Sequence, residues 1–208
     1  PEFLLREDYE AVRPLAESFS GDGYRVMLFG KYTGTLEGQA LTEKVIPLGL
    51  ILLTNPIRRD APETFRYFAQ QGVAVKVISG DNPLTVSRIA MEAEIPGAEK
   101  YIDASTLDSE AAVAQAAGEY TVFGRVTPDQ KRQLVRALQS QGHTVGMTGD
   151  GVNDVLALKD ADCSVAMASG CDAAAQVSQL VLLESDFSAM PSVVAEGRRV
   201  VNNVQRSA

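Results

Sequence analysis

Two different hydrophobic patterns divide the chain. Residues 24–31 (YRVMLFGK) and 48–53 (LGLILL) are short, strongly apolar runs, which is typical of strands. The segment that joins them is polar and contains glycine, so it predicts a connection. We place a boundary between two packing units at Pro47.

Beyond this boundary, short apolar runs alternate with amphipathic segments. The helical segments begin at capping residues or early prolines and end near glycines. They are predicted near residues 60–72, 83–93, 111–117 and 127–142. The apolar runs predict strands at residues 73–78, 121–124, 144–147, 164–167 and 181–183.

This alternation predicts an α/β fold in which a parallel, Rossmann-type sheet is covered by helices on both faces. In open sheets of this kind, ligands bind beyond the carboxyl ends of the strands. We therefore expect the chemistry of the protein in the residues that follow each strand.

Composition and charge reduce the range of possible functions. The 208 residues are 45% hydrophobic and 22% charged, as in ordinary globular proteins. No run approaches the roughly 18 consecutive apolar residues of a membrane-spanning helix. The formal net charge of −8 opposes contact with nucleic-acid phosphates, so nucleic acid is not an expected partner.

Histidine and cysteine are scarce. His143 is the single histidine, so a His-rich metal site is excluded and any Ser/His or Cys/His catalysis would have to use this residue. Cys163 and Cys171 have no CxxC spacing, and no secretory signal precedes them, which favours a reducing compartment.

Ser79, Gly80 and Asp81 follow the predicted strand at residues 73–78. A hydroxyl and free backbone N–H groups at a glycine-containing turn suit a phosphoryl oxygen. The alternative is a plain strand-to-helix turn in which Asp81 or Asn82 caps the helix.

A second candidate site follows the strand at residues 144–147. Asp150 and Asp154 stand four residues apart, with Asn153 between them and glycines on both sides of Asp150. Carboxylates that converge there suit Mg²⁺, which takes one or two protein carboxylates together with waters and substrate oxygens. The alternative is a glycine-rich turn with an aspartate cap, which would leave two negative charges close together without compensation.

Lys131 lies one turn into the helix that Thr127 and Pro128 begin. A lysine near a helix N-terminus opposes the helix dipole, so its position is best explained if it reaches an anion. Taken alone, it could equally be a solvated surface residue.

The sequence resembles the P-type cation-transporting ATPases of the haloacid dehalogenase superfamily. Residues 148–162 (TGDGVNDVLALKDAD) resemble the family's hinge signature, and four further segments occur in the family's order. These are Asn55–Arg58 like D-P-x-R, Ser79–Asp81 like T-G-D, Arg125–Lys131 like R-V-x-P-x-x-K, and Pro1-Glu2 like the end of K-G-A-P-E. The resemblance covers nearly the whole chain.

The resemblance implies a domain plan with a haloacid-dehalogenase-like fold. Residues 1–46 would be the end of a nucleotide-binding domain, residues 47–197 an incomplete phosphorylation domain, and residues 198–208 a stalk that leads to a membrane helix. The chain would then lie at the cytoplasmic face of the cell membrane.

The resemblance also implies roles for individual residues. Mg²⁺ would be bound by Asp150 and Asp154 with the support of Asn153, and the phosphoryl group by Ser79, Gly80 and Asp81, while Lys131 neutralises its charge. ATP would lie near Arg25, Arg58 and Arg125. The other partners would be the missing upstream and transmembrane parts of the same protein and a transported cation, either Ca²⁺ or Mg²⁺.

Two departures from the family pattern matter. The family's nucleophile is the aspartate of D-K-T-G-T, and this motif is absent from the 208 residues. Residues 31–35 (KYTGT) look similar but carry Lys31 at the nucleophile position, and an ammonium cannot replace a carboxylate nucleophile. The central strand that bears the nucleophile should therefore be missing from the sheet, and the chain alone should not phosphorylate itself. Asn55 also stands where the family has an acidic residue.

Two alternatives remain at this stage. One is a freestanding haloacid dehalogenase phosphatase, which would need its own D-x-D-x-T motif; none is present. The other is a non-catalytic module that binds Mg²⁺ or phosphate.

Overall fold

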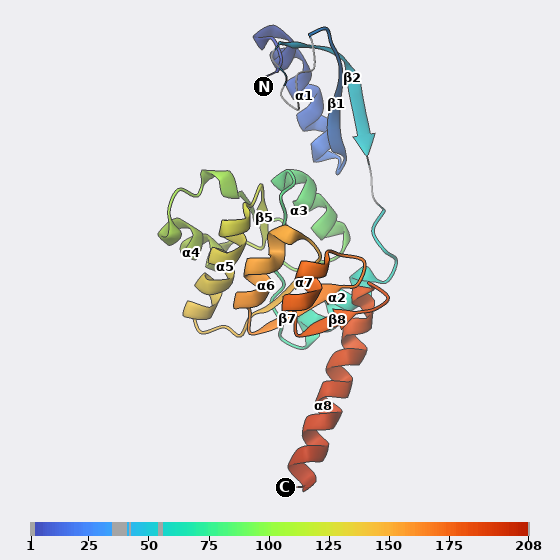
Figure 1. The fold of residues 1–208 in the computed structure, drawn as a ribbon, viewed down its shortest axis with the longest axis vertical. Coiled ribbons are helices and arrows are strands. Elements are labelled where there is room, and N and C mark those ends of the chain that lie inside the picture. Colours follow the sequence, from blue (N-terminus) through green and yellow to red (C-terminus); the bar gives the residue numbers. More distant parts are fainter. Residues whose placement is uncertain (1–2, 35–40, 42, 54–55, 208) are drawn as a thin grey trace. The chain divides into compact units, whose positions relative to one another are not determined.

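The structure is a computed structural model that describes residues 3–34, 41, 43–53 and 56–207. It consists of two compact units, Pro1–Pro56 and Ile57–Ala208 (Figure 1). The Pro1-Glu2, Thr35 and Asn55 positions of the motifs lie outside the described residues.

The first unit contains helix α1 (Arg6–Gly21) and an antiparallel pair of strands, β1 (Arg25–Tyr32) and β2 (Val45–Leu53). Pairing runs from Arg25 opposite Leu53 to Tyr32 opposite Val45, and α1 packs against both strands. Of the described residues in this unit only Leu4 is buried, while Phe29 and Leu48 remain 56% and 60% exposed. The apolar surface of this hairpin therefore has little cover within the described chain.

The boundary between the units lies after Pro56 and not at Pro47 as the sequence suggested. β2 continues through Pro47, which lies opposite Gly30 at an irregularity of the ladder. A two-stranded ribbon tolerates proline at such a position because one edge of the strand needs no ladder hydrogen bond. Gly30 allows Val45 of β2 to lie close to β1, since a Cβ at Gly30 would lie 2.4 Å from Val45 Cγ1.

The second unit alternates strands and helices. Its strands are β3 (Val77–Ile78), β4 (Tyr101–Asp103), β5 (Val122–Gly124), β6 (Gly146–Gly149), β7 (Cys163–Met167) and β8 (Leu180–Leu182). Its α-helices are α2 (Ala61–Gln70), α3 (Pro83–Glu92), α4 (Glu110–Glu119), α5 (Pro128–Ser140), α6 (Val155–Asp160), α7 (Asp172–Val177) and α8 (Met190–Ser207). Short 3-10 helices are η1 (Ala104–Thr106), η2 (Val152–Asp154) and η3 (Phe187–Ala189).

Helices cover both faces of this sheet, as the pattern predicts. Successive side chains of a strand point to opposite faces, and β5 illustrates this. Val122 packs into a core cluster with α3, whereas its neighbour Phe123 packs into a cluster with α4 and α5. Both are buried, and β5 lies between β3 and β4, so it is a central strand. A third cluster joins α5, α6 and α7 to β6 and β7.

The sheet is interrupted, as the resemblance implies. The parallel strands form two separate groups, in the orders β3-β5-β4 and β6-β7-β8. Among the described residues, no strand pairs with the outer edge of β3 or of β6. Each of these two strands therefore presents an open edge that could accept another strand.

Two strand predictions differ from the structure. The run at residues 73–78 is a strand only at Val77–Ile78, and Val73 is 48% exposed. Conversely, β4 was not predicted, because its sequence (YID) contains no continuous apolar run.

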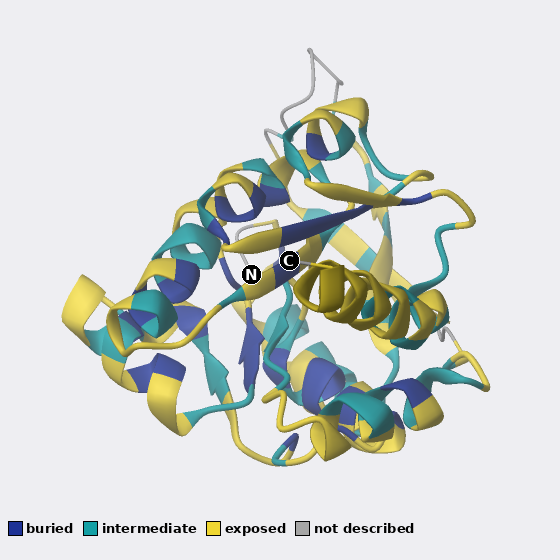
Figure 2. Ribbon diagram, turned by 90° about the horizontal axis from the view of Figure 1, so that it is seen from below, coloured by how far each residue is buried: buried dark blue, intermediate teal, exposed yellow. Residues whose placement is uncertain are grey.

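Helix α8 ends the described chain. Every residue from 195 to 207 is exposed, whereas the start of the helix contacts α2 and η3 (Figure 2). Among the described residues, no helix combines the length and apolar character needed to cross a bilayer.

Candidate phosphate and metal site

Asp154 is the centre of the polar cluster that follows β6. Its side chain is only 9% exposed, and Oδ1 accepts a hydrogen bond from Lys131 Nζ at 2.6 Å. Oδ2 accepts the backbone N–H groups of Asp150 at 3.3 Å and Gly151 at 3.1 Å. Asp154 thus joins α5 to the loop that carries Asp150.

A strong capping box at the start of α5 determines the position of Lys131. Thr127 Oγ1 accepts the backbone N–H of Gln130, and Gln130 Oε1 accepts the backbone N–H of Thr127. The helix therefore begins at Pro128, and Lys131 lies within its first turn. Its side chain is 14% exposed and its ammonium pairs with Asp154, so it is not the solvated surface lysine of the alternative interpretation.

Gly149, the last residue of β6, allows the approach of Asp154. A Cβ at this position would lie 2.6 Å from Asp154 Cβ and 2.9 Å from Asp154 Oδ2. These distances are too short for any side chain, so only glycine fits here without displacing the carboxylate.

Asp150 differs from Asp154 in its surroundings. It is exposed, and its carboxylate accepts no hydrogen bond from the residues that the structure describes. Asn153 is exposed as well. The four acceptor positions of the Asp154 carboxylate are largely used by Lys131 and two N–H groups, so of the two carboxylates Asp150 is the one with free lone pairs.

The oxygen atoms available in this cluster fit a Mg²⁺ ion that also binds phosphate. They do not form a metal site made of protein side chains alone. In the described part of the chain, no three His, Cys, Asp or Glu side chains cluster as metal ligands. Mg²⁺ commonly uses one or two carboxylates and completes its shell with water and substrate oxygens. Asp150 can supply such a carboxylate.

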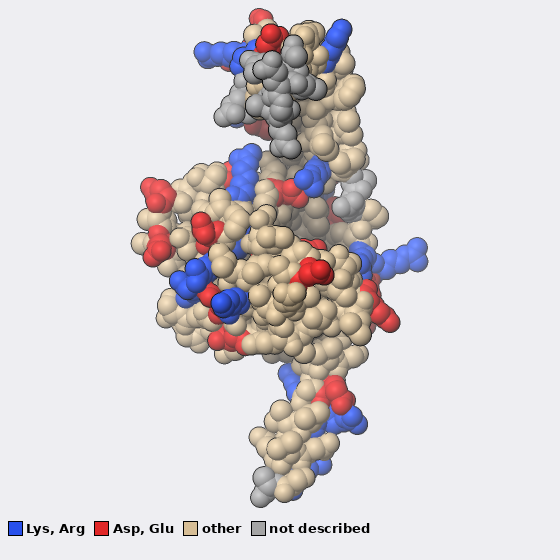
Figure 3. Space-filling view, in the orientation of Figure 1, with Lys and Arg blue, Asp and Glu red and all other residues tan. Residues whose placement is uncertain are grey.

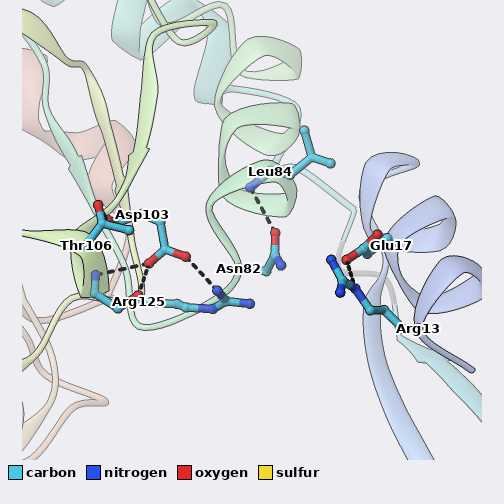
Figure 4. Close-up of polar contacts among 8 residues, drawn as sticks. Arg13, Glu17, Asn82, Leu84, Asp103, Thr106 and Arg125 are labelled. Atoms are coloured by element: carbon cyan, nitrogen blue, oxygen red, sulfur yellow. Dashed lines mark hydrogen bonds and ion pairs between the residues drawn. The ribbon is translucent and has the colours of Figure 1, made fainter. Parts of the chain in front are cut away.

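Ser79 lies at the end of β3, on the other group of strands. Its carbonyl accepts the Val126 N–H at 3.0 Å, so the end of β3 is bound to the residues that begin α5. Ser79 Oγ accepts the Asp81 N–H at 3.1 Å. Gly80 is exposed, and a Cβ there would meet nothing within 4 Å. The cap proposed as the alternative is present too, because Asn82 Oδ1 accepts the Leu84 N–H at 2.9 Å at the start of α3 (Figure 4).

Arg125 adopts a left-handed conformation with φ +52°, which is uncommon for a residue with a Cβ. Its N–H donates to the Asp81 carbonyl at 2.9 Å. Its guanidinium donates to Asp103 at 2.6 Å (Figure 4). Burial of Asp103 by itself raises the pKa of its carboxyl. Hydrogen bonds from Ser105 and the charge of Arg125 together outweigh this effect and hold the pKa below its usual range. Backbone strain of this kind often occurs at functional sites.

The other two predicted arginines lie elsewhere. Arg58 pairs with Asp186 at 3.2 Å and donates to the Ser185 carbonyl at 3.4 Å, both in the segment that follows β8. Arg25 begins β1 in the first unit.

Several residues that shape the site were not singled out from the sequence. Asp103 holds Arg125, and Gly170 and Cys171 lie against the backbone of Asp150, where the Cys171 N–H donates to the Asp150 carbonyl at 2.7 Å. Gly170 follows the predicted strand at residues 164–167, so the same rule that identified Ser79 could have found it. Asp103 ends β4, a strand that the sequence did not predict, so this rule could not have found it.

The charged side chains of the second unit are interspersed on the face shown in Figure 3, where Lys and Arg form no continuous stripe. This face offers no extended positive surface of the kind that binds nucleic acid.

Comparisons with known proteins agree with the predicted resemblance. The family of haloacid dehalogenase-like hydrolases matches residues 7–162. The calcium-transporting ATPase CtpE of Mycobacterium bovis is 47% identical over 209 residues, which cover 100% of this chain and 26% of that protein. The probable cation-transporting ATPase exp7 of Streptococcus pneumoniae is 43% identical, with 98% of this chain and 26% of that protein covered. The magnesium-transporting ATPase, P-type 1, of Salmonella typhimurium is 35% identical, with 90% of this chain and 22% of that protein covered.

The chain thus spans about a quarter of the length of the curated relatives it matches. Among solved structures, the catalytic domain of the CPx-ATPase CopB-B is similar with a TM-score of 0.55 and 22% identity, covering 74% of this chain and 51% of that one. At this identity the likeness concerns the fold alone.

Proposed function

The chain belongs to the haloacid dehalogenase-like hydrolases, and from this premise we propose that it is the catalytic Mg²⁺- and phosphate-binding part of an ATP-driven cation pump. The observation that carries the proposal is the cluster of Lys131, Asp154 and Asp150 beyond β6. It occurs in a chain that is 47% identical over its whole length to a calcium-transporting ATPase.

We propose that the two units correspond to two pump domains. Residues 1–56 would belong to a nucleotide-binding domain, since their hairpin has an apolar surface with little cover and Leu4 is their only buried described residue. Residues 57–197 would belong to the phosphorylation domain, and residues 198–208 to a stalk at the cytoplasmic face of the membrane. The open edges of β3 and β6 would receive the strand that bears the nucleophile.

In this proposal Asp150 is the metal ligand, and Asp154 positions it. Asp154 binds the N–H groups of Asp150 and Gly151 and thereby holds the loop in one conformation. This changes the role expected for Asp154 from direct ligand to support, because its oxygens already accept three hydrogen bonds. Asn153 stays a candidate support next to it.

Lys131 would act on the phosphoryl group. One of its three N–H donors is used by Asp154, so two can reach phosphoryl oxygens. The Ser79 hydroxyl and the Gly80 N–H would bind further oxygens from the end of β3, while the Asp81 N–H is already donated to Ser79 Oγ and would shape this turn. When bound, Mg²⁺ would supply positive charge to the same oxygens. Phosphoryl transfer depends mainly on such positioning and charge stabilisation.

Arg25, Arg58 and Arg125 remain candidates for contact with ATP. Of these, Arg125 has the best support, because Asp103 and the Asp81 carbonyl hold it near the phosphate-binding turn. The transported ion would be a cation, Ca²⁺ or Mg²⁺ by the names of the relatives.

Replacement of Asp150 by Asn is expected to abolish specific Mg²⁺ binding. Titration of the 208-residue chain with MgCl₂, followed by the backbone amide signals of Gly149 to Asn153, should give saturable shifts that Asp150→Asn removes. The matched control is Asp108→Asn, which changes an exposed carboxylate elsewhere on the second unit. Equal shifts in wild type and Asp150→Asn would contradict the proposed metal ligand.

The chain by itself is expected not to form an aspartyl-phosphate. It contains no D-K-T-G-T segment, and Lys31 cannot act as the nucleophile in its place. Incubation with γ-labelled ATP and Mg²⁺, followed by acid precipitation, should leave no hydroxylamine-sensitive label on the protein. Such a label would show that another carboxylate of this chain accepts phosphate.

A further inference from the structure

The turn between β7 and α7 lies directly against the backbone of Asp150. The Cys171 N–H donates to the Asp150 carbonyl at 2.7 Å. A Cβ on Gly170 would lie 2.5 Å from that carbonyl oxygen and 2.9 Å from Asp150 Cα. The position of this turn therefore determines where the backbone of Asp150 can lie.

The same turn is tied on its other side to Ser185, which lies between β8 and η3. The Ser169 N–H donates to Ser185 Oγ at 2.8 Å. Ser185 has a φ of +53°, a conformation that serine rarely adopts. Its own N–H donates to the Leu182 carbonyl at 3.0 Å, so this strained residue is anchored at the end of β8.

Arg58 holds the segment that contains Ser185. Its guanidinium donates to the Ser185 carbonyl at 3.4 Å and pairs with Asp186 at 3.2 Å. Hydrogen bonds from Ser188, its backbone N–H first, and the charge of Arg58 hold the pKa of the Asp186 carboxyl below its usual range. The Arg58 side chain is 64% exposed, and an ion pair so exposed contributes little to global stability.

We propose that Ser185, held by Arg58, is a positioning residue for Asp150 and acts through the turn of residues 169–171. The path consists of three hydrogen bonds: Arg58 to Ser185, Ser169 to Ser185, and Cys171 to Asp150. Groups that orient a metal ligand typically change metal affinity by about 10- to 100-fold. The inference rests on the proposed role of Asp150 as the Mg²⁺ ligand.

This role explains two features that the phosphate site alone does not. Serine is kept in a conformation that glycine would adopt at lower cost, which is reasonable if its hydroxyl oxygen is required as an acceptor. Arg58, one of the residues assigned to ATP from the sequence, has a structural reason to be an arginine, since it binds a carbonyl and a carboxylate at once.

The test compares Ser185→Gly, Ser185→Ala and Arg58→Gln in the 208-residue chain. The readouts are the dissociation constant for Mg²⁺, measured from the Gly151 amide shift, and the thermal unfolding midpoint. Ser185→Gly relieves the positive φ but removes the acceptor, so the thermal midpoint should stay equal or rise while the Mg²⁺ dissociation constant increases by about tenfold. Ser185→Ala should raise the Mg²⁺ dissociation constant by a similar factor. Arg58→Gln should raise it by a smaller factor.

Arg66→Gln is the matched control for Arg58→Gln. It removes an exposed ion pair, Arg66 with Glu94 at 2.7 Å, that has no contact with the 169–171 turn in the described structure. Its Mg²⁺ affinity should equal that of wild type. An unchanged affinity in Ser185→Gly, or an equal loss in Arg66→Gln, would overturn the inference. A wild-type chain that binds no Mg²⁺ would instead overturn the proposed function.

Discussion

Replacement of Lys131 by Met is expected to destabilise the second unit by about 3 kcal/mol. The substitution keeps most of the apolar stem but removes the charge that compensates Asp154, whose side chain is 9% exposed. A buried carboxylate that loses its cation is costly, although two backbone N–H groups continue to bind Asp154 Oδ2. The same change removes the cation that we assign to the phosphoryl group.

Urea unfolding followed by circular dichroism measures this effect. Lys159→Met is the matched control, because Lys159 is an exposed lysine of α6, and its loss should change the free energy of unfolding by no more than about 0.5 kcal/mol. The double variant Lys131→Met/Asp154→Asn should lose less than the sum of its two single variants, since neither charge is then left without its partner. Additive losses would mean that the pair at 2.6 Å is not energetically coupled.

Replacement of Gly149 by Ala is expected to cost about 1–3 kcal/mol and to weaken Mg²⁺ binding as well. The new methyl group would lie 2.6 Å from Asp154 Cβ and 2.9 Å from its Oδ2, so the Asp154 side chain would have to move. That movement would break its hydrogen bonds to Lys131 and to the N–H groups of Asp150 and Gly151. Stability and metal binding should therefore fall together.

Gly146→Ala provides the comparison within the same strand. A Cβ at Gly146 would meet only the Cys163 carbonyl oxygen, at 3.9 Å, so this variant should be as stable as wild type or slightly more stable. Mg²⁺ titration and urea unfolding of both variants separate the effect of the close contact from a general preference for glycine in β6. Equal behaviour of the two variants would contradict the role given to Gly149.

Much of the fold could be predicted because its signals are local. Thr127 and Pro128 begin α5 where the sequence indicates, and the alternating strands and helices predict the parallel, doubly covered arrangement that Val122 and Phe123 illustrate in β5. The sequence did not show that β3 is limited to two residues, because pairing with β5 determines where that strand begins. It did not show β4 either, because this segment has no continuous apolar run and is a strand through its pairing with β5.

The candidate site was predictable as a set of positions but not as a set of contacts. The rule that ligands gather at strand ends selects Ser79, Asp150 and Asp154, and the helix N-terminus draws attention to Lys131. The family resemblance then supports all four. None of these signals indicates that Asp154 uses its oxygens for Lys131 and backbone N–H groups, or that Arg58 binds Asp186. Such contacts join residues more than twenty positions apart, except for those within the loop itself.

The sequence alone thus determined the class of fold, the order of its elements and the residue types available for phosphate and Mg²⁺, because periodicity, capping and turn preferences act over a few neighbouring residues. Only the tertiary structure decided that β2 pairs with β1 along its whole length, that β4 pairs with β5, and that the turn of residues 169–171 contacts both Ser185 and Asp150. These outcomes depend on how distant segments pack, and no local signal encodes the path of the chain between them.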